Sequence, residues 1–265
     1  MKANGRRRKS YRKPRLKTRA MQRQVEKELR LGWSPEQISG RLKQAGAKVR
    51  VSHEAIYQWI YRARRDLREC LCWGRKRRMK RGHSRKHRTL HIPERTPLAE
   101  RPAVIAGRRQ AGHWECDLAV SKAGKGSLQV AVERASGYTL IMRLPNQKAP
   151  EVRRALNRRM SRLPRGLRRS LTYDNGHENV EHQRVNAVLG TRSYFCDPYA
   201  SWQKATVENT IGLIRRSWPK GSAFHLLARQ EVKGMERKLN NRPRKCLQFR
   251  TPKEVFSKQS VALHC

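Results

Sequence analysis

The strongest constraint on the fold is a series of short apolar segments between residues 113 and 218, whose spacing switches between the period of a strand and that of a helix. The first segment, HWECDLAV, alternates apolar and polar residues, so Trp114 and Cys116 are expected on one face of a strand and Asp117 on the other. Further strands are expected at residues 127–133, 138–144, 170–174 and 192–196, and helices at 149–163, 177–190 and 202–218. The resulting order, βββαβαβα, predicts a mixed α/β sheet with helices on its faces.

A smaller helical domain is expected before this sheet, over residues 20–64. Ser34 and Gln37 have the spacing of a capping box ahead of an apolar stripe, and Ser52 is expected to cap a further helix. Three short helices with basic flanks are similar to a helix-turn-helix DNA-binding unit, and a plain helical spacer is the alternative. The residues of this unit that we expect to contact DNA are Ser52, His53 and Tyr57.

The charge of the chain narrows the choice of partners. Lys and Arg number 63 against 20 Asp and Glu, and this net charge of +43 calls for a polyanion such as nucleic acid. Basic residues are dense in a disordered arm at 1–19 and in a linker at 65–107. The linker separates the helical domain from a core at 108–224. A C-terminal helix and tail at 225–265 are expected to dock on that core. The basic run of the linker that we expect to contact DNA is Arg75, Lys76, Arg77 and Arg78.

Several classes of protein are disfavoured. No run approaches the roughly 18 apolar residues of a membrane span, and the first residues lack the apolar stretch of a secretory signal peptide. The six cysteines follow no disulfide framework, and Cys70 and Cys72 lack the compact spacing of a zinc module with the histidines that follow them. We therefore expect a cytoplasmic, nucleoid-associated protein without a membrane or small-molecule partner.

Acidic residues are scarce, so a carboxylate within an apolar segment is informative. Asp117 lies within the first strand, Asp174 ends a later strand, and Glu208 lies on a helix, so the three can converge at one edge of the sheet. Three hard oxygen donors without His or Cys suit two Mg²⁺ or Mn²⁺ ions, which can promote attack at phosphorus. His113 and Glu115, on the same face as Asp117, are expected to pack or to form ion pairs at the strand edge, and orienting or supplementing the metal ligands is the alternative.

Four motifs carry a resemblance to a known family: GHWECD at 112–117, TYDNGHE at 172–178, YFCDPYASWQKATVENTIGLIRRSWPKG at 194–221 and LNNRPRKCLQFRTPKEVF at 239–256. With them the chain resembles the bacterial insertion-sequence transposases of the family numbered thirty, and LGWSPEQISGRL with VSHEAIYQWIY resembles the DNA-binding part of that family. The family has an Asp, Asp, Glu triad with 33 residues between the last two, and residues 175–207 here number 33. The resemblance implies a ribonuclease-H-like core with Asp117, Asp174 and Glu208 as its catalytic and metal-binding triad.

The resemblance also implies an activity. It is that of a DDE transposase, which binds terminal inverted repeats, cleaves a DNA strand and transfers it to target DNA with two metal ions, and which works as a homo-oligomer. Arg215 lies two helical turns after Glu208, where the family has a basic residue, and Lys204 lies one turn before it, so both are expected to hold a DNA phosphate. The C-terminal residues expected to be available to DNA are Arg242, Arg244 and Lys245.

The chain departs from the family pattern at two places. Family members commonly begin with a further helix-turn-helix, whereas the match here begins in the basic region that would follow it, so we expect end recognition to be affected more than chemistry. Cys116 stands where the family usually has Gly, and it is expected to pack on the face opposite Asp117. Two other functions stay open: a catalytically decayed copy that binds DNA as a repressor, and a basic RNA-binding protein.

Overall fold

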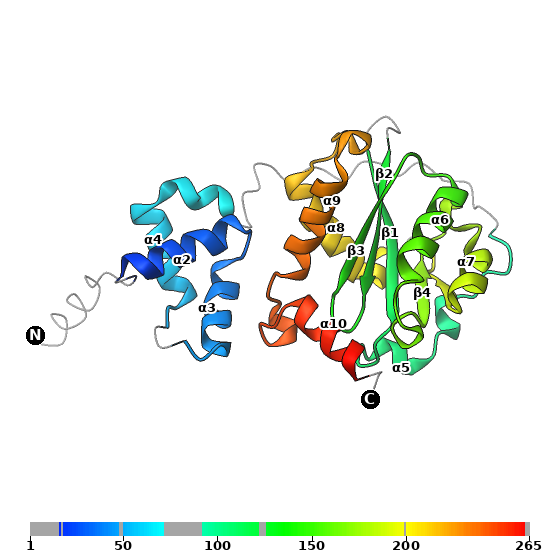
Figure 1. Cartoon of the computed structure of the whole chain (residues 1–265), viewed down its shortest axis with the longest axis horizontal. Coiled ribbons are helices and arrows are strands. Elements are labelled where there is room, and N and C mark those ends of the chain that lie inside the picture. The colour runs from blue at the N-terminus through cyan, green and yellow to red at the C-terminus, as the bar shows by residue number, and fades with distance from the viewer. Residues whose placement is uncertain are drawn as a thin grey trace, which may run out of the picture. The chain divides into compact units, whose positions relative to one another are not determined.

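The computed structural model describes residues 16, 18–47, 50–71, 92–121, 126–198 and 200–262. The chain divides into two compact units: Met1–Ser84 with Arg242–Thr251, and Arg85–Asn241 with Pro252–Cys265. The first is the helical unit and the second holds the β-sheet (Figure 1). Among the described residues, no helix has both the length and the apolar character needed to cross a bilayer.

Hydroxyl caps define where the helices of the helical unit begin. The side chains of Thr18, Ser34 and Ser52 each accept a hydrogen bond from the backbone N–H three residues on. Ser34 and Gln37 complete the predicted capping box. The helices described in this unit are α2 (Arg19–Arg30), α3 (Pro35–Gln44), α4 (His53–Ala63) and the short 3-10 helices η1 (Arg65–Cys70) and η8 (Lys245–Leu247). Their fully buried apolar residues are Val25, Leu29, Ile38, Ile56, Ile60 and Leu67.

The segment predicted as a linker is anchored at both of its described ends. Leu67 of η1 is fully buried in the core of the helical unit, and Arg64, just before η1, forms an ion pair of 2.6 Å with Glu26 of α2. At the other end, Ile92 is buried in the core of the sheet unit. The described residues at the two ends of this segment therefore pack in the cores of the two units.

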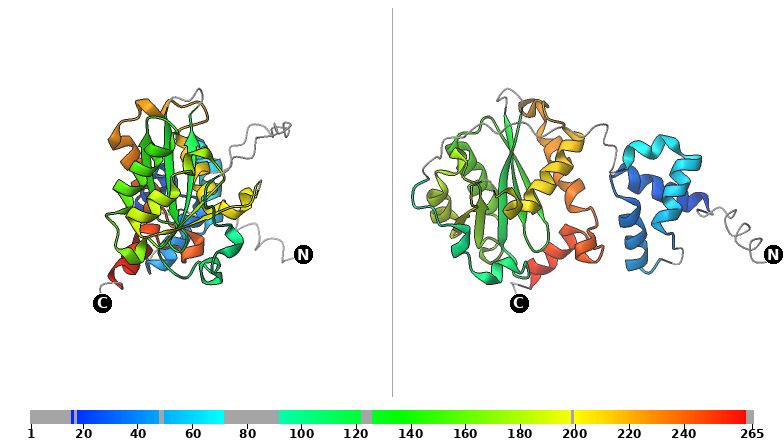
Figure 2. Two further views of the ribbon diagram at one scale, coloured as in Figure 1. Left: turned by 90° about the vertical axis from the view of Figure 1, so that its right-hand side faces the viewer. Right: turned by 180° about the vertical axis from the view of Figure 1, so that it is seen from behind.

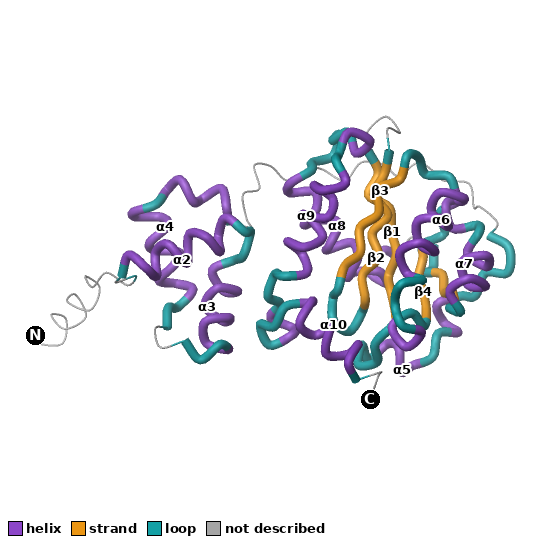
Figure 3. Tube along the Cα trace, viewed as in Figure 1, coloured by secondary structure: helices purple, strands orange, loops and turns teal. Residues whose placement is uncertain are grey.

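A mixed five-stranded sheet in the order β3-β2-β1-β4-β5 lies at the centre of the second unit (Figure 3). Its strands are β1 (His113–Val120), β2 (Ser127–Glu133), β3 (Thr139–Leu144), β4 (Ser170–Tyr173) and β5 (Arg192–Phe195). The first three form an antiparallel meander, whereas β4 pairs parallel with β1 and β5 pairs parallel with β4. This topology confirms the predicted α/β class with a ribonuclease-H-like sheet.

Helices cover both faces of this sheet. In the views of Figures 1 and 2, α6 (Ala149–Met160) and α7 (His182–Leu189) lie on one face, and α8 (Ala205–Ser217) and α9 (Arg229–Asn240) lie on the other. Phe256 of α10 (Pro252–Val261) stacks on Tyr138, with ring centroids 4.2 Å apart. The short helices of this unit are η2 (Leu98–Glu100), α5 (Ala103–Ala106), η4 (Arg165–Leu167), η5 (His177–Asn179), η6 (Ser201–Lys204) and η7 (Phe224–Leu226).

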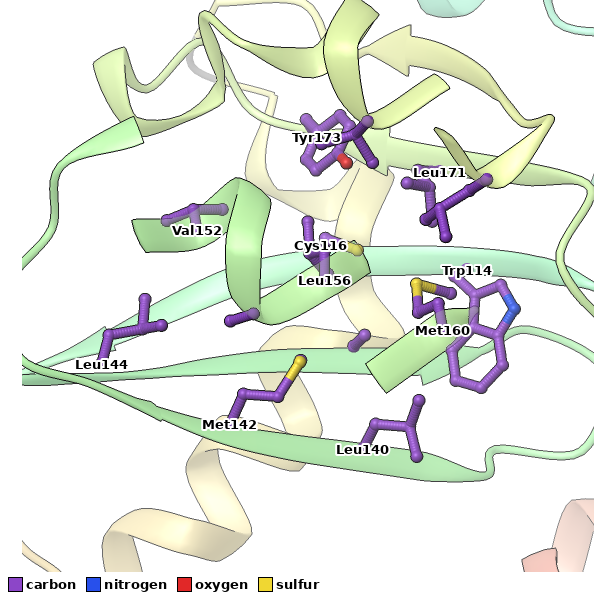
Figure 4. Close-up of a cluster of buried hydrophobic side chains, with 14 of the residues drawn as sticks. Trp114, Cys116, Leu140, Met142, Leu144, Val152, Leu156, Met160, Leu171 and Tyr173 are labelled. Carbon is purple, nitrogen blue, oxygen red and sulfur yellow. The ribbon is translucent and has the colours of Figure 1, made fainter. Parts of the chain in front are cut away.

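The alternation along β1 separates the apolar core from the polar face. Trp114 and Cys116 point into the cluster beneath α6 and α7 (Figure 4), while Ala119 belongs to the cluster beneath α8 and α9. Cys116 is 1% exposed, and burial raises the pKa of its thiol well above the usual range. The cysteine therefore packs as an inert core residue on the face opposite Asp117, as predicted.

All three predicted helices are shorter than the sequence pattern suggested: α6 ends at Met160, and the other two are interrupted near their starts. The segment 177–190 begins with η5, and α7 follows it and ends at Gly190, whose φ of 65° is the left-handed conformation that favours glycine. The segment 202–218 begins with η6, and α8 starts only at Ala205. In the first case the interruption has a clear purpose, since Asn179 at the end of η5 turns its side chain back to Asp174.

Candidate active site

The register of β1 with β4 brings two of the predicted carboxylates together. The parallel ladder ends at the pair Glu115 and Thr172. Asp117 and Asp174 each lie two residues further along, so they point to the same face of the sheet as that pair. Beyond this point β1 continues beside β2, whereas the chain leaves β4 at Asp174. The two aspartates thus meet where the strands part, at the carboxyl end of β4, which is a usual place for a ligand site in α/β sheets.

A buried lysine joins the two aspartates. The Nζ atom of Lys204 lies 3.4 Å from Oδ1 of Asp117 and 3.2 Å from Oδ2 of Asp174, and its side chain is only 4% exposed. Burial opposes the charged form of this lysine, but Asp174 and Asp117 outweigh that effect and raise the pKa of Lys204. The ammonium group that was expected to hold a DNA phosphate is therefore held between two carboxylates.

Each aspartate is also fixed by a hydrogen bond from the chain around it. The backbone N–H of Leu118 donates to Oδ1 of Asp117 at 2.8 Å, and Nδ2 of Asn179 donates to Oδ1 of Asp174 at 3.0 Å. Burial raises the pKa of Asp117, and the charge of Asp174 adds to this effect while Lys204 opposes it. The carboxylates are thus oriented, and they repel one another wherever a cation does not lie between them.

Glu208 lies in the first turn of α8 and is exposed. Partial burial raises the pKa of Glu208, and the negative charge of Asp117 raises it further. Within the described part of the chain, no three His, Cys, Asp or Glu side chains surround a common point that could hold a metal ion. The structure therefore brings Asp117 and Asp174 onto one cationic group and leaves Glu208 beside them, outside that contact.

A further carboxylate, Glu178, was not predicted as a site residue. Burial raises the pKa of Glu178, and the charges of Asp174 and Asp117 contribute to the rise. Its side chain folds back over Gly176, where an added Cβ would lie 2.4 Å from Oε2 of Glu178. The motif TYDNGHE could have indicated this residue. Its glycine, two residues before Glu178, leaves space for the Glu178 side chain to fold back along the chain.

The chemistry of the site suits a hard divalent cation. Asp117, Asp174 and Glu208 offer carboxylate oxygens, which Mg²⁺ and Mn²⁺ prefer as ligands. Lys204 already places a positive charge between Asp117 and Asp174, so this pair accommodates a cation. The residues present therefore fit the expected metal.

Arg215 makes contacts other than the predicted one with DNA. Its guanidinium donates a hydrogen bond to the carbonyl of Val120 at the end of β1 and lies 5.0 Å from the ring centroid of Phe224. These contacts tie α8 to β1, and a phosphate contact by Arg215 stays a prediction.

The predicted DNA contacts on α4 differ in their surroundings. The hydroxyl of Ser52 accepts a hydrogen bond of 3.2 Å from the N–H of Ala55, so it serves as the helix cap. His53 is exposed and Tyr57 is half-buried on the same helix. Ser52 and His53 are therefore both exposed, whereas Tyr57 is only partly so.

The C-terminal candidates lie in the segment that belongs to the helical unit. Arg242 is buried and donates a hydrogen bond of 2.9 Å to Oε1 of Gln37, which corrects the expectation that it is available to DNA. Arg244 is half-buried and burial lowers its pKa, whereas Lys245 is exposed. Arg75, Lys76, Arg77 and Arg78 lie outside the described residues.

Comparison with known proteins relates most of the chain to an integrase core domain and to insertion-sequence transposases. The integrase core domain family matches residues 107–201, which include Asp117 and Asp174. The chain is 39% identical over 249 residues to transposase InsI for insertion sequence element IS30C of Escherichia coli K12, covering 90% of this chain and 64% of the relative. It is 37% identical over 258 residues to the transposase for IS4351 of Bacteroides fragilis, covering 96% of this chain and 78% of the relative.

One further relative and one solved structure are also similar to this chain. The transposase for IS1086 of Cupriavidus metallidurans is 36% identical over 233 residues, covering 85% of this chain and 68% of the relative. Among solved structures, the catalytic core domain of BIV integrase is 19% identical with a TM-score of 0.43, covering 58% of this chain and 99% of that one.

The sheet and the aspartate pair at its edge, together with the family match, define an integrase-type core. More narrowly, the chain belongs to the IS30 family of insertion-sequence transposases. It spans 64% of the length of the Escherichia coli relative.

Proposed function

We propose that this protein is a DNA transposase that cleaves strands at the ends of its element and joins them to target DNA. The observation that carries the proposal is the convergence of Asp117 and Asp174 on one buried cationic group, in a chain whose relatives are named transposases. A protein that only bound DNA would have no need to hold two carboxylates together at the edge of its sheet.

The triad residues share one task in this proposal. Asp117, Asp174 and Glu208 would hold two divalent cations, Mg²⁺ or Mn²⁺. When bound, these ions supply activation of the attacking hydroxyl and charge neutralisation at the leaving 3′ oxygen of a phosphodiester. The chain itself supplies orientation, because the N–H of Leu118 and the amide of Asn179 hold the two aspartates in place. Lys204 balances their charges before the site is loaded.

Double-stranded DNA is the proposed substrate, both as the terminal inverted repeats of the element and as the target. The net charge of +43 favours such a polyanion, and the capped three-helix unit with exposed His53 is the proposed reader of the repeats. We also propose that the protein acts as a homo-oligomer on paired ends, in the bacterial cytoplasm at the nucleoid.

The test is nicking of supercoiled plasmid by the purified protein with Mg²⁺, with Mn²⁺ or with EDTA, beside the variant Glu208→Gln. We expect nicking that needs the metal and disappears in Glu208→Gln, because this variant keeps the size of the side chain and loses its charge. Equal nicking by both proteins would overturn the assignment of Glu208.

A second measurement separates the enzyme from a decayed, binding-only copy. DNA carrying the terminal repeats of the element replaces the plasmid, and cleavage and binding are measured on the same samples. Tight binding without cleavage of these ends in either metal would contradict the proposed activity. Preferential competition by RNA over DNA at the same salt concentration would instead favour the RNA-binding alternative.

A further inference from the structure

Glu115 is a carboxylate with no exposure to solvent, two residues before Asp117 on the same face of β1. The sequence predicted packing or ion pairing for it. A carboxylate buried to this extent is strongly unfavourable unless hydrogen-bond donors and positive charge surround it. Its partners therefore indicate what the residue does.

The first set of partners is the start of α8. Oε2 of Glu115 accepts hydrogen bonds from the backbone N–H of Thr206 at 2.9 Å and of Val207 at 3.1 Å, and the hydroxyl of Thr206 donates to Oε1 at 3.2 Å. The first N–H groups of a helix have no partner within the helix, and its dipole places positive charge there. The residue at the N-cap of α8, Lys204, makes no side-chain capping bond, so Glu115 supplies the cap from a strand.

The second partner is a buried arginine at the end of β2. Nη1 of Arg134 lies 2.5 Å from Oε1 of Glu115, and the side chain of Arg134 is only 5% exposed. The two carboxylate oxygens are therefore surrounded by a positive group and three donors from α8. Glu115 thus connects β1, the end of β2 and the first turn of α8 through one pair of oxygen atoms.

The first turn of α8 is also where the site residues of this helix lie. Glu208 directly follows Val207, and Lys204 directly precedes the helix. We propose that Glu115 is a positioning residue, which fixes the start of α8 on β1 so that Glu208 faces Asp117 and Asp174. This inference rests on the proposed function of the triad, and it assigns to Glu115 no contact with metal or DNA.

A merely structural role is the competing explanation, and the chain provides a matched control for it. Glu133 on β2 is equally buried and accepts hydrogen bonds from the N–H groups of Gly112 at 3.1 Å, Ala135 at 3.1 Å and Ser136 at 2.6 Å. All of its hydrogen-bond donors lie near the ends of β1 and β2, and none of them is in α8. The variants Glu115→Gln and Glu133→Gln therefore each replace a fully buried, hydrogen-bonded carboxylate with an amide, but only Glu115 accepts hydrogen bonds from the helix that carries Glu208.

The experiment compares the full-length protein with these two variants and with Glu208→Gln. Hydrogen exchange of a peptide spanning residues 201–210 reports on the start of α8, and titration with Mn²⁺ reports on the metal site. Plasmid nicking gives kcat and KM separately. For Glu115→Gln we expect faster exchange in 201–210 and weaker Mn²⁺ binding. We also expect kcat to fall about 100-fold, the loss typical when a reacting group is misplaced by about 1 Å. The KM for DNA should be unchanged. Glu133→Gln should resemble the unmodified protein in all three.

A milder variant covers the case in which Glu115→Gln does not fold. Thr206→Val keeps the shape of the side chain and removes only the hydroxyl that donates to Glu115. It should change exchange, Mn²⁺ binding and kcat in the same direction and to a smaller extent. Normal kcat and normal exchange at 201–210 in both variants would overturn the positioning role.

The outcomes also separate this inference from the proposed function. If the unmodified protein does not nick or join DNA, the transposase proposal fails, and exchange and Mn²⁺ binding still decide the role of Glu115. If the unmodified protein is active while Glu115→Gln and Glu133→Gln are equally impaired, the positioning role fails and the transposase proposal stands.

Discussion

Lys204 lies within 3.5 Å of a carboxylate oxygen of both Asp117 and Asp174, with almost no exposure to solvent. Two neighbouring carboxylates repel each other when no cation separates them. The lysine therefore lets the aspartates approach each other in a protein that has bound no metal. A divalent cation held by the same two carboxylates would have to compete with this lysine.

Replacing this lysine should strengthen metal binding. In Lys204→Met the competing ammonium is gone, so we expect Mn²⁺ to bind roughly tenfold more tightly, which corresponds to about 1.4 kcal/mol. Titration of the full-length protein with Mn²⁺ measures the change. Lys238→Met, an exposed position on α9, controls for the loss of one positive charge. Unchanged or weaker binding in Lys204→Met, relative to that control, would rule out competition.

His113, which lies outside the triad, should make the stability of the protein depend on pH. Its ring contacts Ser170 at 2.7 Å and Gln110 at 2.8 Å, and burial, with the nearby charge of Arg169, lowers the pKa of His113 to about 4. In an unfolded chain the pKa is about 6.5, so between these values the unfolded state takes up a proton that the folded state does not. Stability should therefore be lost as the pH falls from about 6.5 to 4.

Chemical denaturation at pH 7 and at pH 4.5 tests this expectation. The free energy of unfolding should fall by about 2 kcal/mol more in the unmodified protein than in His113→Asn, which keeps a polar side chain and has no titrating ring. The comparison cancels the groups that titrate in both proteins, such as His182. Equal losses in the two proteins would show that His113 is not held neutral by the fold.

At the scale of the elements, Ser52 distinguishes two interpretations of α4. The sequence suggested both a helix cap and a DNA contact for this residue, and in the structure its hydroxyl caps the helix. Ser52→Ala should therefore destabilise the helical unit by about 1 kcal/mol. Ser52→Asn should restore most of that stability, because the side chain of Asn, like that of Ser, can cap a helix. Hydrogen exchange in α4 measures the effect. Weaker DNA binding in Ser52→Ala with unchanged exchange would favour the DNA contact instead.

The elements also show how far the sequence alone could lead. The alternation in β1 correctly placed Cys116 in the core and on the face opposite Asp117, and the spacing of Ser34 and Gln37 gave the cap of α3. These are local patterns, which depend on residues near in sequence. The position of Lys204 and the cap that Glu115 provides could not be predicted, because Glu115 and Thr206 are 91 residues apart and meet only when α8 packs on β1.

At the scale of the whole molecule, the excess of positive charge sets the affinity for DNA. A protein with a net charge of +43 is expected to contact six or more phosphates, each contact releasing counterions. The affinity for duplex DNA should then fall by about a thousandfold between 50 and 200 mM salt. Fluorescence anisotropy with a duplex of unrelated sequence checks this, since phosphate contacts are independent of sequence. A flat response to salt would contradict binding to a polyanion.

The alternation along β1 also limits how the gene for this protein can change in length. Trp114 and Cys116 lie on the core side, and Glu115 and Asp117 lie on the side of α8. Removing or adding one codon within the strand would exchange the two sides beyond that point. Apolar side chains would then face Asp174, which directly follows β4, and carboxylates would enter the apolar core. Single-codon insertions and deletions should therefore be tolerated in the loops around β1 and eliminated within it, even where point substitutions at the same positions persist.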